Sequence, residues 1–131
     1  MLRTKDILDE KDPRVRAKNT DVDFPLNDEY KDIIPEMLKH LRYSQIEKLS
    51  KKYDLRPGMG LAAPQLGINK NFFVVCYEVK DGVFDDYILI NPKVISYSEE
   101  MIYAGEGEGC LSVNREVEGI VPRHARITVE A

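Results

Sequence analysis

The chain has 131 residues and a net charge of −4 at pH 7; 43% of the residues are hydrophobic and 32% are charged. This composition excludes a disordered polypeptide, and the acidic balance offers no basic surface for nucleic-acid phosphates. No apolar run approaches the roughly 20 residues of a membrane helix, and the first residues lack the apolar core of a signal peptide. We therefore expect one domain over residues 1–131, located in the cytoplasm, with Cys76 and Cys110 as reduced thiols.

The N-terminal half predicts two helices. Residues 1–26 are polar and irregular, with a short turn or helix expected at Pro13. A helix is expected from an N-cap at Asn27 or Asp28, and Pro35 should kink it unless it lies in the first turn. Its apolar face has helical spacing and consists of Ile33, Ile34, Met37, Leu38 and Leu41. A second helix is expected over residues 45–53, ended by Arg56-Pro57-Gly58.

The C-terminal half predicts strands. Residues rich in β-branched and aromatic side chains predict strands at 71–80, 86–90, 93–103, 117–121 and 126–130. Helices followed by strands favour an α+β fold, with N-terminal helices packed on antiparallel sheets. The last expected strand reaches Ala131 with no terminator after it, which is typical of a domain that has been cut. We expect a piece of a longer enzyme in preference to a natural remnant.

The first chemical motif is GMGLAAPQ at residues 58–65. Two glycines around Met59 allow the backbone to approach a ligand closely, because no Cβ intervenes. Pro64 fixes the backbone before Gln65, whose side-chain N–H could donate to a developing oxyanion. The alternative is an ordinary glycine-rich turn with Gln65 in solvent. The glycine spacing fits no phosphate-binding loop.

The second motif is EGCLS at residues 108–112. Small neighbours leave the Cys110 sulfur accessible, so it could ligate zinc or ferrous iron, act as a nucleophile, or be an inert thiol. Cys76 lies in an apolar run and is expected to be buried and inert. As a nucleophile Cys110 would need a nearby base, and His124 is the only candidate.

Together the two motifs resemble the first two signature motifs of peptide deformylases, which are metal-dependent hydrolases that remove the N-formyl group from new bacterial polypeptides. The resemblance implies that Gln65 and the backbone N–H of Leu111 stabilise the oxyanion of the tetrahedral intermediate. It also implies that Cys110 is a metal ligand, with Fe²⁺ (or Zn²⁺, Ni²⁺ or Co²⁺) as the metal. The longer segment at residues 43–56 resembles an insertion typical of the enzymes of low-GC Gram-positive bacteria.

The same resemblance assigns the substrate-binding residues. Met59, beside Gly58, would line the pocket for the methionine side chain of the substrate, and Gly60 would bind the substrate backbone. Arg123 would pair with Glu108 and brace the site. The implied partners are N-formylmethionyl nascent polypeptides, with transient association with the ribosome.

The third motif of that family, His-Glu-x-x-His on a C-terminal helix, is not in the sequence. His40 is expected on the polar face of the first helix, in solvent, and neither it nor His124 can form the motif. Residues 1–131 alone are therefore expected to bind metal poorly and to be inactive, with the other two ligands and the catalytic Glu beyond residue 131. The alternative function is a catalytically inactive module that binds peptides.

Overall fold

Helix α1 (Asp28–Ser44) begins where the sequence predicts. The Asn27 side chain caps it by accepting a hydrogen bond from the Glu29 N–H at 2.8 Å. Ile34, Met37 and Leu41 are buried at helical spacing, so one face of α1 packs inward. The helix continues past Pro35 to Ser44 as a single element. The computed structural model describes all of residues 1–131.

The central sheet has three antiparallel strands in the order β1-β2-β3: β1 (Gly60–Ala62), β2 (Phe72–Lys80) and β3 (Val83–Ile90). A tight turn at Gly82, where φ is +74°, joins β2 to β3. Strand β3 begins three residues before the expected start at residue 86. Strand β1 was not expected, because three residues containing a glycine give no strand pattern.

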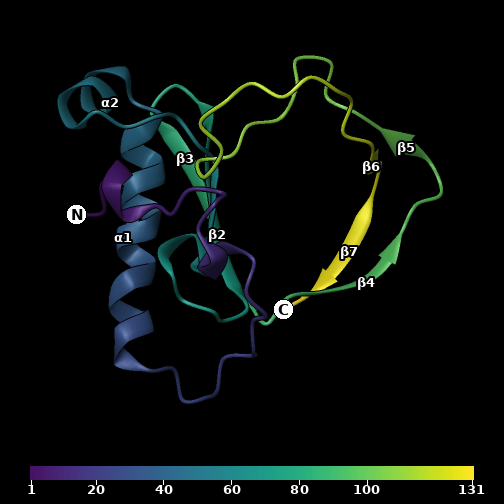
Figure 1. The fold of residues 1–131 in the computed structure, drawn as a ribbon, viewed down its shortest axis with the longest axis horizontal. Helices are drawn as coiled ribbons and strands as arrows, with labels where there is room; N and C mark the ends of the chain where they lie inside the picture. The colour runs from purple at the N-terminus through teal and green to yellow at the C-terminus, as the bar shows by residue number, and fades with distance from the viewer.

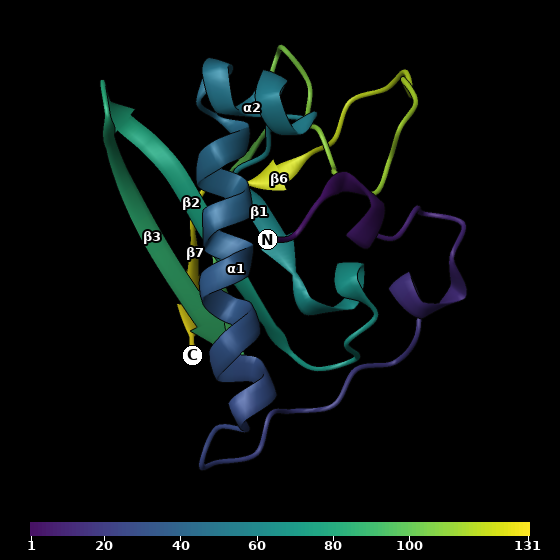
Figure 2. The ribbon, with the colours of Figure 1, turned by 90° about the vertical axis from the view of Figure 1, so that its left-hand side faces the viewer.

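Helix α1 lies across one face of this sheet (Figure 2), and the core fills the space between them. The buried side chains of β2 alternate along the strand at Phe72, Val74 and Cys76. Cys76 is buried as expected, and desolvation raises the pKa of its thiol to about 11. The core also contains Met37, Leu41 and Leu61 from α1 and β1.

The remaining strands form two antiparallel pairs on the side of the sheet away from α1 (Figure 1). Strand β4 (Lys93–Tyr97) pairs with β7 (Ile127–Glu130), and β5 (Met101–Ile102) pairs with β6 (Arg123–His124). The strand expected at 93–103 is thus divided in two. The strand predicted at 117–121 is wrong, because this segment is exposed and has no partner strand. The α+β class with antiparallel sheets is confirmed.

Helix α2 (Glu47–Tyr53) is shorter than expected, since Gln45 is the C-cap of α1. Short 3-10 helices occur at Thr4–Asp6, Pro13–Val15 and Ala63–Leu66, and the second agrees with the element expected at Pro13. The prediction for His40 is wrong: its side chain is buried, and Nδ1 lies 2.9 Å from the Leu2 carbonyl oxygen. The N-terminal segment covers that face of α1, which helical periodicity alone does not reveal. No helix combines the length and apolar character that a membrane span requires.

Candidate active site

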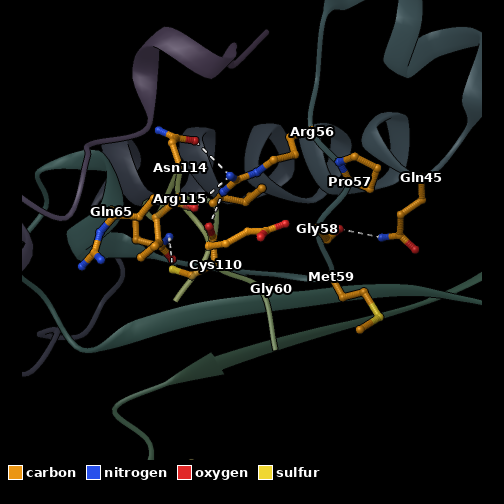
Figure 3. Close-up of a pocket in the computed structure, with 14 residues that line it drawn as sticks. Gln45, Arg56, Pro57, Gly58, Met59, Gly60, Gln65, Cys110, Asn114 and Arg115 are labelled. Atoms are coloured by element: carbon orange, nitrogen blue, oxygen red, sulfur yellow. Dashed lines mark hydrogen bonds between the residues drawn. The ribbon is translucent and has the colours of Figure 1, made fainter. Parts of the chain in front are cut away.

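A pocket of about 910 Å³ lies between the two motifs (Figure 3). Residues 56–60 and Gln65 contribute one part of its lining, and residues 109–111 and 113–116 contribute another. The fold thus brings Gln65 and Cys110, which are far apart in the sequence, to one cavity. The structure also places Gly58, Met59, Gly60 and Leu111 around it.

The amide of Gln65 is held at both ends. Its Oε1 accepts a hydrogen bond from the Ala62 N–H at 2.9 Å, and its Nε2 donates to Ser112 Oγ at 3.1 Å. These two bonds fix which end of the amide faces the second motif, and Nε2 lies 3.8 Å from Cys110 Sγ. Ser112 is buried, so its hydroxyl is a stable anchor that the sequence analysis did not single out.

The second motif forms a tight turn. The Val113 N–H donates to the Cys110 carbonyl at 3.0 Å, and the guanidinium of Arg56 donates to the same carbonyl. The Leu111 N–H, in the peptide that follows this carbonyl, donates to no group of the chain. The arrangement leaves one backbone donor without a partner in the residue that follows Cys110.

The two motifs are in direct contact at Gly58. A Cβ added there would lie 3.0 Å from the side chain of Leu111, so only glycine leaves that side chain undisturbed. Ser44 Oγ accepts a hydrogen bond from the Gly58 N–H at 3.1 Å, and Gln45 Nε2 donates to the Gly58 carbonyl at 2.9 Å. Ser44 and Gln45 were missed by the sequence analysis. The sequence offers one clue to Ser44: it stands three residues after Leu41, which places it on the apolar face of α1, where it is buried.

Met59 and Gly60 lie where a peptide could approach. The Met59 side chain is 62% exposed and lines the pocket. Gly60 begins β1, which pairs with β2 on one side and is the edge strand of the sheet. A free strand edge offers backbone donors and acceptors to an extended peptide.

Glu108 and Arg123 form the expected ion pair. Arg123 Nε and Nη2 donate to the Glu108 carboxylate at 3.1 to 3.2 Å, and this hydrogen bonding raises the pKa of Arg123. His124 is the next residue, yet its ring lies 4.3 Å from that of Tyr97, and its Nδ1 is 2.8 Å from the Ser98 carbonyl oxygen. It is not among the residues that line the pocket with Cys110, so the structure does not supply the base for a cysteine nucleophile.

The residues around Cys110 do not complete a metal site. No group of three or more His, Cys, Asp or Glu side chains in residues 1–131 could hold a metal ion. A catalytic zinc or iron site takes three protein ligands as a rule. The residues present therefore do not fit a catalytic metal by themselves, and Cys110, whose side chain is exposed at the pocket, could provide one bond.

The sequence matches the polypeptide deformylase family over residues 4–131. The peptide deformylase of Oceanobacillus iheyensis is 47% identical over 131 residues, which are 100% of this chain and 72% of that protein. The peptide deformylase of Halalkalibacterium halodurans is 50% identical over the same shares of the two chains.

Solved structures show the same fold. The peptide deformylase from Thermotoga maritima is 32% identical with a TM-score of 0.64, and the match covers 94% of this chain and 69% of that one. Arabidopsis thaliana peptide deformylase 1B is 27% identical with a TM-score of 0.72, over 96% of this chain and 61% of that one. The chain belongs to the peptide deformylase family, the metal-dependent hydrolases that remove the N-formyl group from newly made polypeptides.

Proposed function

We propose that Gln65 Nε2 and the Leu111 N–H are the oxyanion donors of the deformylation reaction. Hydrolysis of a formamide passes through a tetrahedral intermediate whose oxygen carries negative charge. Donors fixed in advance around that oxygen lower the barrier, since they need no reorganisation as the charge develops. The observation that carries the proposal is the 3.8 Å separation of Gln65 Nε2 and Cys110 Sγ at one pocket.

The substrate would bind across Gly58, Met59 and Gly60. The Met59 side chain would border the space for the methionine side chain of an N-formylmethionyl polypeptide. The backbone of Gly60 would pair with the extended substrate along the free edge of β1. Glycine at position 60 suits this role, because a side chain there would stand beside the incoming backbone.

Cys110 would provide one ligand to the metal of the active enzyme, for which Fe²⁺ is proposed, with Zn²⁺, Ni²⁺ or Co²⁺ as alternatives. A thiolate is a soft ligand that suits each of these ions. The Glu108–Arg123 pair would hold the loop that presents the cysteine. We further propose a single domain over residues 1–131, a cytoplasmic location and transient contact with the ribosome, because the substrate is a nascent chain.

The test uses metal-loaded enzyme from the complete reading frame and an N-formylmethionyl tripeptide. Gln65→Ala is expected to lower kcat by about 10²- to 10³-fold, as for the loss of one oxyanion donor elsewhere. Gln65→Glu should lower kcat at least as much, because it keeps the acceptor for the Ala62 N–H and places a negative charge beside the oxyanion. Full activity in both variants would refute the assignment.

A second measurement concerns the cysteine. Cys110→Ser is expected to reduce the metal content of the purified enzyme, whereas Cys76→Ser should leave it unchanged, because Cys76 is buried in the core. Equal metal content in both variants would remove Cys110 from the ligand set. An inactive peptide-binding module, the alternative function, is not favoured by the family membership.

A further inference from the structure

Arg56 joins the two motifs through the backbone of the second. It lies just before the first motif, and its guanidinium donates to three acceptors of the 110–114 turn (Figure 3). Nη1 donates to the Val113 carbonyl and to Asn114 Oδ1, each at 2.9 Å, and Nη2 donates to the Cys110 carbonyl. The side chain itself is exposed, so these three contacts define its position.

The Cys110 carbonyl and the Leu111 N–H belong to the same peptide unit. The unit is planar and trans, so the two groups point in opposite directions. Two donors, the Val113 N–H at 3.0 Å and Arg56 Nη2, hold the carbonyl end. Fixing that end fixes the direction of the N–H at the other end. A charged donor on the carbonyl also polarises the amide, which makes its N–H a better donor.

We propose that Arg56 is a positioning residue for catalysis: by holding the Cys110 carbonyl, its guanidinium aims the Leu111 N–H at the oxyanion. This inference rests on the proposed role of the Leu111 N–H. The role needs an arginine, because a planar fork can reach the Val113 carbonyl and the Cys110 carbonyl at once, whereas a lysine is a single point donor. Arg115, the other arginine of the pocket, is paired with Glu10 at 2.8 Å and makes no such contact.

The test uses metal-loaded enzyme from the complete reading frame, with Arg56→Lys, Arg56→Gln and Asn114→Ala as variants. Both Arg56 variants should lower kcat by about tenfold or more with KM changed less than about twofold, because the transition state loses a well-aimed donor. Asn114→Ala removes one of the three contacts and should give a smaller loss in the same direction. Arg126→Gln, an exposed arginine with one 3.5 Å ion pair, removes the same charge and should have no effect.

A spectroscopic readout separates aiming from general damage. In ¹⁵N-leucine-labelled protein, the Leu111 amide resonance should shift in the Arg56 variants while the resonances of Leu41 and Leu61, in the core, stay in place. Unchanged kcat, an unchanged Leu111 resonance, or a loss that falls on KM alone would each overturn the role of Arg56. If Gln65→Ala were also fully active, the oxyanion assignment itself would fail, which distinguishes the two failures.

Discussion

Gly58 has no Cβ, and this allows the side chain of Leu111 to pack directly against its backbone. Its backbone is held by Ser44 and Gln45, and it lies against the side chain of Leu111. The first motif therefore limits where the second can lie. This contact explains why the first motif has a glycine at position 58.

Gly58→Ala is expected to displace Leu111 and to disturb the N–H of the same residue. The new Cβ would lie 3.0 Å from three atoms of the leucine side chain, which is too close for an undisturbed contact. We expect a loss of about 1 to 3 kcal/mol in the free energy of unfolding, the usual effect of overpacking, together with lower kcat. Gly105→Ala is the control, because nothing lies within 4 Å of a Cβ there. Equal denaturation midpoints for the two variants would contradict the contact.

The thiol of Cys76 should make the free energy of unfolding depend on pH in the alkaline range. Burial raises its pKa from 9.0 to about 11, with a further contribution from a hydrogen bond to Asp86. Between these values the unfolded chain has lost the thiol proton and the folded chain keeps it, so the free energy of unfolding falls as pH rises. The stabilisation is complete below pH 9, and about 2 to 3 kcal/mol should be lost by pH 11.

The measurement is urea denaturation of the chain and of Cys76→Ala at intervals from pH 8 to pH 11. The variant should be less stable at pH 8, because it leaves a cavity, yet it should lack this part of the decline. The difference between the two proteins isolates the contribution of the Cys76 thiol. Parallel curves of unfolding free energy against pH for the two proteins would show that the Cys76 thiol does not titrate in this range.

At the residue scale, the sequence indicates the candidate site residues better than it indicates the residues that hold them in place. Gln65 and Cys110 became candidates because the motifs that contain them resemble two motifs of a known family, and the structure places both residues at one pocket. The roles of Ser112 and Gln45 could not be predicted, because they depend on which groups the fold brings within 3.1 Å of them: the side-chain amide of Gln65 for Ser112 and the Gly58 carbonyl for Gln45. His40 was misplaced for the same reason, since the Leu2 carbonyl that it meets is 38 residues away.

The junction of α1 and α2 holds the first motif in place through the side chain of Gln45. Gln45 ends α1 and turns its side chain inward, where Nε2 donates to the Gly58 carbonyl at 2.9 Å and to the Cys76 carbonyl at 2.6 Å. Its Oε1 accepts from the Glu78 N–H at 3.3 Å. One side chain thus ties a helix end, a loop and β2 together.

Gln45→Met keeps the length of the side chain and removes its hydrogen bonds. The Cys76 and Gly58 carbonyls would lose a donor in a half-buried place, so we expect a loss of about 1 to 3 kcal/mol in the free energy of unfolding. Ser50→Ala on α2 is the comparison, because its hydroxyl makes one exposed hydrogen bond to Glu47. Equal thermal midpoints for the two variants would show that the hydrogen bonds of Gln45 contribute nothing to stability.

Elements with a strong local pattern could be predicted, and those made by pairing could not. Helix α1 has its cap and its apolar face in the sequence, and β2 has its run of β-branched and aromatic residues. The segment 117–121 also has a strand-like composition, yet no strand lies beside it. Strand β1 has almost no composition of its own and exists because residues 60–62 pair with residues 73–75 of β2.

At the scale of the whole molecule the buried core is off-centre. Every buried residue except Ser112 lies between residues 22 and 76, on α1, on β1, on β2 or next to them. Strands β4, β5, β6 and β7 contribute none, and they expose large apolar side chains such as Ile95, Tyr97 and Ile102. Their backbone hydrogen bonds therefore have little packing to protect them from water.

This asymmetry predicts two levels of protection in native-state hydrogen exchange of the 131-residue chain. Amides of α1 and β2 should exchange only through global unfolding, because opening them exposes Met37, Leu41 and Val74. Amides of the β4–β7 and β5–β6 pairs should open locally and exchange at least about 100-fold faster, a difference of about 3 kcal/mol in opening free energy. Mass spectrometry of peptic peptides from the two regions measures the ratio directly. Equal protection in both would mean that residues 1–131 unfold as one cooperative unit and that the exposed strands share the stability of the core.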